Sequence, residues 1–174
     1  ELSVALSRGQ SADKLVRERA AEAAVRLGVR LLPETFAVGL SARLRQLRTT
    51  RGNLNYTRLV LAQGARPALP VALPAELCWR VNHLHGWAGL QARLAERSPQ
   101  DVAVIGAGMI GCEIAEDLAR AGHRVTLVDH QSLPLANLLP EPAARRLHAA
   151  QRQLGIELLG DVEIDSLTLL PDGR

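Results

Sequence analysis

The hydrophobic positions after residue 100 follow a strand–helix–strand order. One apolar run ends at Ile105 and a glycine-rich turn follows it, and a second apolar run ends at Val128. Between them, apolar residues recur at helical spacing, at Ile110, Ile114 and Leu118. This pattern predicts three elements: a strand over 102–105, a helix that ends before Gly122, and a strand over 124–128.

The same order continues beyond residue 129. A loop rich in leucine and proline comes first, and the spacing of apolar residues then changes from helical to extended. The predicted elements are a loop over 133–140, a helix over 142–154 that ends at Gly155, a strand over 156–159, and the start of an antiparallel meander over 162–170. The half of the chain after residue 100 is therefore expected to form a parallel sheet with helices.

The first 65 residues show shorter and more varied runs. Ser11 is a suitable N-cap and Gly28 a suitable C-terminal residue for a helix over 11–27. The run 59–62 is apolar throughout, which is typical of a strand buried on both faces. Further strands are predicted over 29–32 and 35–40, with a hairpin of 44–50 and 53–57 that turns at Arg51 and Gly52.

Three prolines between residues 65 and 74 separate these two parts. Proline fixes φ and removes a backbone donor, so we expect an extended crossing there. A helix over 84–96 follows, with Trp87 on its apolar stripe and therefore in the core. His83 and His85, at the start of this helix, are interpreted as solvated or capping histidines rather than metal ligands. The sequence thus predicts three parts: 1–75, a connecting segment over 76–100, and 101–174.

Composition is that of a globular protein, with 174 residues, 47% of them apolar and 22% charged. Aromatic residues are only 2%, and the positive charge is carried by scattered arginines, because Lys14 is the only lysine. Nucleic-acid binding is therefore a poor interpretation. Cys78 and Cys112 fit no paired motif, which favours a reducing cytoplasm. No apolar run reaches the length of a membrane helix.

The glycine-rich turn after Ile105 is the part of the sequence that indicates a ligand. Gly106 allows the tight turn, Gly108 leaves no Cβ between the backbone and a pyrophosphate, and Gly111 lets the helix lie close to the strand. The helix N-terminus offers free N–H groups and a positive dipole end to the phosphates. Asp129 follows at the spacing that places an acid against a ribose hydroxyl. A site for a nicotinamide or flavin dinucleotide is expected, and the alternative is an ordinary strand–turn–helix without a ligand.

The residues after the acid bear on the choice of dinucleotide. Asp129 is followed by His130 and Gln131, not by arginine. A 2′-phosphate would meet a carboxylate and no obvious cation, so NADH is preferred over NADPH.

Two segments resemble FAD-dependent pyridine nucleotide–disulfide oxidoreductases: Tyr-Thr-Arg-Leu-Val-Leu-Ala-Gln-Gly-Ala-Arg-Pro over 56–67 and Gly-Ala-Gly-Met-Ile-Gly-Cys-Glu over 106–113. The similarity is closest to rubredoxin reductases and to the ferredoxin reductases of oxygenase systems, and it covers almost the whole chain. In that family an NAD domain interrupts an FAD domain. The resemblance implies an α/β fold, with a Rossmann-like parallel-sheet NAD-binding domain over 101–174 and part of an FAD-binding domain with an antiparallel meander over 1–75.

The resemblance also implies the chemistry. FAD would accept a hydride from NADH and pass electrons to a small redox protein, rubredoxin or ferredoxin. Glu113 would lie near the nicotinamide, although an acid in the first helical turn is an equal alternative. Ala62 and Gly64 would run near the flavin, and Gln63 departs from the family's usual threonine. The residues assigned to the NADH pyrophosphate and ribose are Gly106, Ala107, Gly108, Met109, Ile110, Gly111 and Asp129.

Other functions stay open on the sequence. The same frame serves NADH oxidases, disulfide reductases and nitrite reductase subunits, and a non-catalytic NAD-binding module is a further alternative. The chain starts without methionine and stops at a predicted turn over 171–174. We therefore expect a fragment of a longer cytoplasmic enzyme, inactive alone, with no nucleic-acid or membrane partner.

Overall fold

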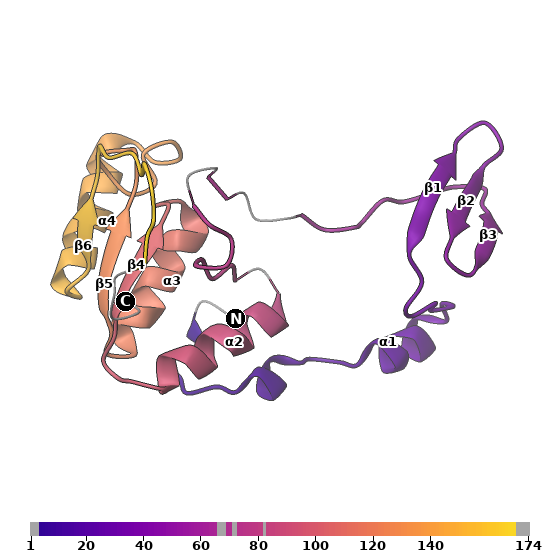
Figure 1. Cartoon of the computed structure of the whole chain (residues 1–174), viewed down its shortest axis with the longest axis horizontal. Coiled ribbons are helices and arrows are strands. Elements are labelled where there is room, and N and C mark those ends of the chain that lie inside the picture. The colour runs from indigo at the N-terminus through magenta and orange to yellow at the C-terminus, as the bar shows by residue number, and fades with distance from the viewer. Residues whose placement is uncertain (1–3, 66–68, 71–72, 82, 170–174) are drawn as a thin grey trace. The chain divides into compact units, whose positions relative to one another are not determined.

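The computed structural model describes residues 4–65, 69–70, 73–81 and 83–169. The chain divides into two compact units: residues 1–15 together with 67–174, here called the coenzyme unit, and residues 16–66, here called the meander unit. Figure 1 labels the elements of both, and each unit is considered by itself. No helix among the described residues is long and apolar enough to cross a membrane.

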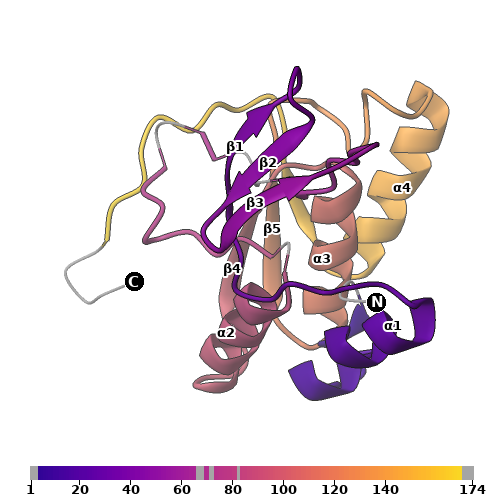
Figure 2. The ribbon, with the colours of Figure 1, turned by 90° about the vertical axis from the view of Figure 1, so that its right-hand side faces the viewer.

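The meander unit contains one antiparallel sheet. Its strands β1 (Ala37–Ser41), β2 (Gln46–Thr49) and β3 (Gly52–Asn55) pair in the order of the chain, and Figure 2 shows them together. Gly52 has a φ of +108°, a conformation that favours glycine at the end of the hairpin turn. The predicted hairpin is confirmed, with its turn one residue earlier, because Thr49 pairs with Gly52.

The predicted helix over 11–27 is wrong in its length. The chain forms a short 3₁₀ helix, η2 (Ala12–Leu15), and a separate helix, α1 (Ala20–Leu27). The carboxylate of Glu22 accepts the backbone N–H of Arg19 at 3.3 Å, which supplies a partner for a free donor at the start of α1. Gly28 then ends α1 in the left-handed conformation, with φ +63°, as predicted.

Three predicted strands do not form. Residues 29–32, 59–62 and 162–169 have no regular secondary structure, and residue 170 lies outside the described part. In the predicted buried strand, Val60 is 85% exposed and Leu61 67% exposed. A strand needs a neighbour for its backbone N–H and C=O groups. No strand within the described residues pairs with these segments.

The coenzyme unit contains the predicted parallel sheet. Its strands are β4 (Asp101–Ile105), β5 (Arg124–Val128) and β6 (Glu157–Leu159), in the order β4-β5-β6. Helix α3 (Met109–Arg120) connects β4 to β5, and α4 (Glu141–Gln153) precedes β6 (Figure 1). Gly122 has a φ of +93° just after α3, which confirms its predicted place.

The core of this unit joins the sheet to α3 and to α2 (Leu84–Ala95). Trp87 is 1% exposed, which confirms the prediction that it lies in the core. His83 is the N-cap of α2, and its Nδ1 accepts the backbone N–H of Gly86 at 2.9 Å. Members of the main cluster come from α2, the glycine turn, α3, β5 and the segment before β6: Leu90, Leu94, Ala107, Cys112, Ala115, Leu118, Val125, Leu127 and Ile156.

His123 makes the stability of this unit sensitive to acid. Burial lowers the pKa of its imidazole, and its Nδ1 accepts the backbone N–H of Gln100 at 3.2 Å, which requires that nitrogen to be unprotonated. The unfolded chain therefore takes up a proton at a higher pH than the folded chain does, starting near the ordinary histidine pKa of about 6.5. The contribution of this group to stability is present above that pH and is lost as the pH falls through it.

We expect His123→Asn to make the free energy of unfolding less dependent on pH between about 7 and 5 than in the wild type. Denaturant unfolding of the full-length protein across that range measures the slope. His85→Gln, at an exposed position of α2, is the control for the loss of a histidine. An unchanged slope in the His123 variant would show that this histidine does not take part.

Candidate nucleotide-binding site

The glycine turn lies at the carboxyl end of the parallel sheet. Gly106 directly follows β4 and has a φ of +101°, a conformation that L side chains rarely adopt. Its backbone N–H donates to the carbonyl of Val128, at the end of β5, at 2.8 Å. The turn is thus anchored where two strands end, which is where ligands bind in open α/β sheets.

Gly111 sets how closely α3 approaches the turn. A Cβ added at this position would lie 1.8 Å from the carbonyl oxygen of Gly106 and 3.7 Å from Cγ1 of Val104. The first distance is far inside van der Waals contact, and the atom concerned is backbone. Only glycine therefore fits here, as the sequence predicts.

Gly108 is different, because a Cβ added to it would meet nothing within 4 Å. It is the N-cap of α3, with φ −74° and no side-chain cap. The first N–H groups of a helix have no partner within the helix, and together with the helix dipole they attract anions. An open space thus adjoins the N-terminus of α3, as a pyrophosphate site requires.

The first turn of α3 exposes apolar side chains. Met109 is 63% exposed and Ile110 66% exposed. Glu113 is also exposed, and it is the fifth residue of the helix, while the first turn contains no acid. The alternative interpretation of Glu113 as a first-turn acid is therefore wrong. Its predicted place near a nicotinamide stays a prediction.

Asp129 lies directly after β5 and points back to the glycine turn. Its side chain is 10% exposed, and its carboxylate accepts the backbone N–H of Ala107 and, at 2.7 Å, that of Gln131. Nδ1 of the exposed His130 lies 3.3 Å from the same carboxylate. A carboxylate has about four lone-pair sites, so these contacts leave capacity for a ligand hydroxyl.

Both backbone polar groups of Ala107, the N–H and the carbonyl, form hydrogen bonds. Besides the N–H bond to Asp129, its carbonyl accepts the backbone N–H of Leu135 at 2.9 Å and the thiol of Cys112 at 3.4 Å. Leu135 has a φ of +56°. Sequence reasoning missed this contact, since a leucine in a loop gives no signal that its backbone supports the turn.

Cys112 is buried, with 7% exposure. Burial is the main cause that raises the pKa of its thiol; a hydrogen bond with Gln151 acts in the opposite direction, and the carboxylates of Asp129 and Glu113 act in the same direction as burial. The thiol is therefore neutral at physiological pH, which suits a hydrogen-bond donor rather than a nucleophile.

Ala62 and Gly64 belong to the meander unit, in a segment without regular structure. Gly64 has a φ of +74°, so the backbone turns there in a way that favours glycine. Their predicted place near a flavin stays a prediction.

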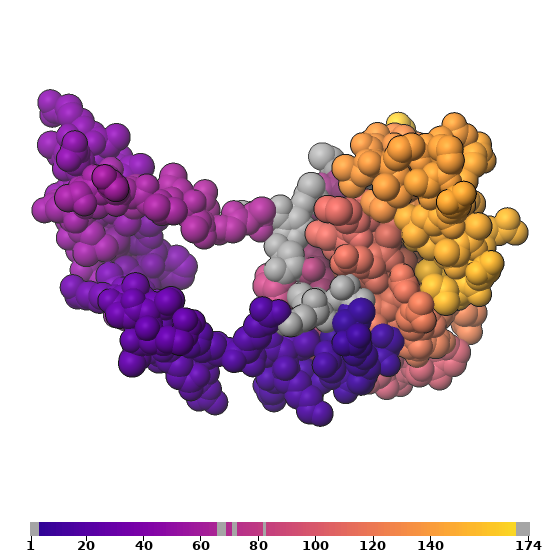
Figure 3. Space-filling model, turned by 180° about the vertical axis from the view of Figure 1, so that it is seen from behind, coloured from indigo at the N-terminus to yellow at the C-terminus, as the bar shows by residue number. Residues whose placement is uncertain are grey.

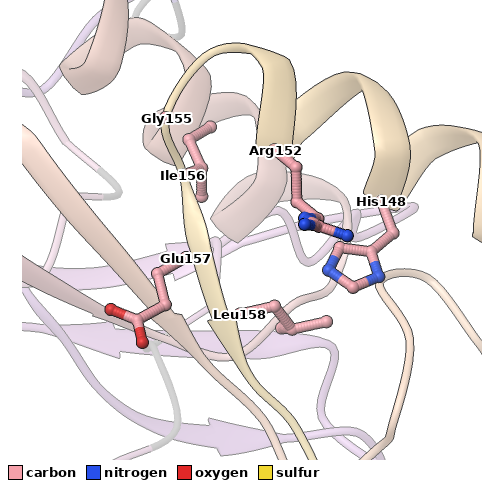
Figure 4. Close-up of a pocket in the computed structure, with 6 residues that line it drawn as sticks. All are labelled: His148, Arg152, Gly155, Ile156, Glu157 and Leu158. Atoms are coloured by element: carbon pink, nitrogen blue, oxygen red, sulfur yellow. The ribbon is translucent and has the colours of Figure 1, made fainter.

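A cavity of about 430 Å³ lies between the end of α4 and β6. Figure 4 shows His148 and Arg152 side by side on α4. Glu157 at the start of β6 also lines it, and β6 runs parallel to β4, so this is the opposite end of the sheet from the glycine turn. No residue of the glycine turn lines this cavity, and it is separate from the candidate nucleotide site.

No group of three or more histidine, cysteine, aspartate or glutamate side chains suited to a metal ion occurs among the described residues. The arrangement that remains is a parallel β-α-β unit with a glycine turn, an open helix N-terminus and an acid after the second strand. It defines a Rossmann-type α/β protein.

The chain belongs to the pyridine nucleotide-disulphide oxidoreductase family, whose model matches residues 4–168. This confirms the family that the sequence predicts. The chain is 35% identical over 173 residues to the nitric oxide reductase FlRd-NAD(+) reductase of Klebsiella pneumoniae (strain 342), a match that covers 99% of this chain and 45% of that protein. The chain thus spans about half the length of the curated relatives it matches.

Two solved structures share the fold. The ferredoxin reductase for the CYP199A2 system of Rhodopseudomonas palustris has a TM-score of 0.83 at 23% identity, over 99% of this chain and 45% of that one. The water-forming NADH oxidase of Lactobacillus brevis, bound to NADH, has a TM-score of 0.84 at 21% identity, over 98% of this chain and 39% of that one. The predicted α/β fold class is confirmed.

The two glycines should respond differently to one added methyl group. Gly111→Ala forces the backbone of α3 and the turn apart, and we expect it to lower the free energy of unfolding by about 2–3 kcal/mol. Gly108→Ala places its methyl group in open space, so its stability should stay within about 0.5 kcal/mol of the wild type. Denaturant unfolding of both full-length variants measures the difference, and equal losses would contradict this account of Gly111.

Proposed function

We propose that this chain is part of an FAD-dependent NADH oxidoreductase that passes a hydride from NADH to FAD and electrons on to a small redox protein. The observation that carries the proposal is the glycine turn with Gly108 open at the N-terminus of α3 and Asp129 beside it. Within this proposal, residues 1–75 are the partial FAD-binding domain, 76–100 the connecting segment and 101–174 the NAD-binding domain.

The residues of the turn fit a dinucleotide. The free N–H groups at the start of α3 bind the pyrophosphate, and Gly108 lets the backbone approach it closely. Met109 and Ile110, both exposed, cover the apolar side of the coenzyme. Asp129 accepts a hydroxyl of the adenosine ribose, with its carboxylate already fixed by two backbone N–H groups.

The same carboxylate supports NADH over NADPH. A 2′-phosphate at this position would bring two negative groups together, and the next residues, His130 and Gln131, supply no arginine. Glu113 lies one helical turn beyond the phosphate site on the exposed face of α3. In this proposal it orients the nicotinamide.

The fit to FAD rests on fewer residues. Ala62 and Gly64 supply a backbone turn for it, and residues 1–65 contain no second G-x-G-x-x-G sequence. When bound, the flavin supplies the two-electron chemistry, and this chain contributes alignment and water exclusion. We therefore expect that the isolated 174 residues bind no FAD stoichiometrically and have no turnover.

The acceptor is a rubredoxin or a ferredoxin in this proposal. The name of the Rhodopseudomonas relative, a ferredoxin reductase, supports a small protein carrier. The name of the Lactobacillus relative, an NADH oxidase, supports oxygen as the second candidate. Two cysteines without a paired motif favour the cytoplasm as the place of reaction.

An acceptor assay on the full-length protein tests the function. We expect NADH to reduce a bound flavin and reduced protein to turn over at least about 10-fold faster with rubredoxin or ferredoxin than with oxygen alone, because a specific acceptor binds and is oriented. Faster turnover with oxygen would support the oxidase instead. NADH binding without any flavin would support a non-catalytic module.

The ribose contact is tested by Asp129→Asn with two ligands. NADH affinity of the full-length protein should fall about 10-fold or more, because a charged hydrogen bond is lost. Reduced nicotinamide mononucleotide, which lacks the adenosine ribose, should bind both proteins equally in calorimetry. An equal loss of affinity for both ligands would mean that the carboxylate acts only by stabilising the turn. An unchanged affinity for NADH would contradict the proposed ribose contact.

A further inference from the structure

A buried carboxylate links α3 to a distant segment of the coenzyme unit. Asp117, in the third turn of α3, is 2% exposed. Its Oδ2 accepts the backbone N–H of Leu6 at 2.8 Å, and its Oδ1 accepts that of Ser7 at 2.9 Å. An ionised carboxylate is costly to bury unless it is hydrogen-bonded. Both oxygens are satisfied here, and by a segment more than a hundred residues away.

The segment that Asp117 holds is compact. The N–H of Gly9 donates to the carbonyl of Leu6 at 3.0 Å, and that of Gln10 to the carbonyl of Ala5 at 2.9 Å. Ala5 is fully buried, and Leu6 packs against the main hydrophobic cluster. In Figure 3 the indigo atoms near the N-terminus lie against the salmon-coloured part of the chain. Residues 4–10 therefore form a small body fastened to α3.

A second bond fixes the end of this body. Nε2 of Gln91, on α2, donates to the carbonyl of Gln10 at 2.8 Å. The segment is thus held by a carboxylate at its start and by an amide at its end. The two holders come from α3 and α2, which share one core.

The proposed pyrophosphate site and the anchor of residues 4–10 both lie on helix α3. Its N-terminus faces the proposed pyrophosphate, and Asp117 lies eight residues further on, or about 12 Å along the helix axis. A helix moves as a body over such a length. A shift of the N-terminus of α3 therefore also moves Asp117 and residues 4–10. In the same way, the position of residues 4–10 influences the position of the helix N-terminus.

We propose that Asp117 is a positioning residue for hydride transfer, which fastens residues 4–10, assigned in the proposed function to the partial FAD-binding domain, to the helix that binds NADH. This inference rests on the proposed function. A hydrophobic side chain at position 117 would fill the same buried space but would not orient another backbone. Two charge-assisted bonds from one carboxylate fix direction as well as distance.

The test uses the full-length flavoprotein with Asp117→Asn and Asp117→Ala. Asparagine keeps the size but offers one acceptor, and its amide group opposes a backbone N–H. The matched control is Glu116→Gln, the next residue of α3, whose side chain is about half exposed and pairs with Arg120. Hydrogen exchange of residues 4–10 should be about 10-fold faster or more in the Asp117 variants and unchanged in the control.

The functional measurement is anaerobic stopped-flow reduction of the flavin by NADH. The limiting rate per bound flavin should fall roughly 10- to 100-fold in the Asp117 variants, because misplacement by about 1 Å is costly for catalysis. The dissociation constant of NADH should stay within about twofold, since the turn at the helix N-terminus is unchanged. Expressing the rate per bound flavin removes the effect of any variant that folds or loads poorly.

The outcomes separate the two proposals. Faster exchange, a lower limiting rate and unchanged NADH affinity in the Asp117 variants support the inference. A wild-type limiting rate in Asp117→Asn, with NADH reducing the wild type normally, overturns the inference and leaves the proposed function standing. A wild-type flavoprotein that NADH does not reduce overturns the proposed function and the inference with it.

Discussion

The contact between Gly111 and the carbonyl of Gly106 governs the geometry of the coenzyme unit. With no Cβ at residue 111, α3 begins right against the end of β4. This closeness is what aims the helix N-terminus at the space above the turn, where Gly108 leaves room. A helix set back by one methyl group would still pack on the sheet, but its free N–H groups would lie farther from the turn, and the effect of a helix dipole falls off within the first turn.

The turn so formed is stabilised by residues that do not belong to the glycine motif. Ala107 donates to Asp129 and accepts from Leu135 and Cys112, so strand end, loop and helix all converge on one residue. Asp129 therefore has a structural duty besides the proposed ribose contact. Because the carboxylate of Asp129 accepts two backbone N–H groups, it is nearly buried and its orientation is fixed before any ligand binds.

The sequence predicted the β-α-β part of the coenzyme unit, residues 101–128, well because its signals are local. Glycine positions, helical spacing and the acid after β5 each determine the backbone within a few residues of themselves. The meander unit was harder to predict. The run 59–62 has the composition of a buried strand, but composition cannot supply the neighbouring strand that buries it. Val60 is 85% exposed, and no strand among the described residues pairs with this run.

Asp117 shows a different limit of sequence reasoning. A charged residue on a helix is ordinarily predicted to face solvent, because charged side chains are rarely buried unless they have a partner. The sequence alone does not show whether such a partner lies opposite. Here two backbone donors from residues 6 and 7 lie opposite, and only the fold brings them there. The glycine turn at the N-terminus of α3 can thus be predicted from the sequence, because it depends on neighbouring residues. The contact of Asp117 in the third turn of the same helix cannot, because it depends on residues far away in the sequence. Since both lie on one helix, the long-range contact is the one that links the proposed coenzyme site to residues 4–10.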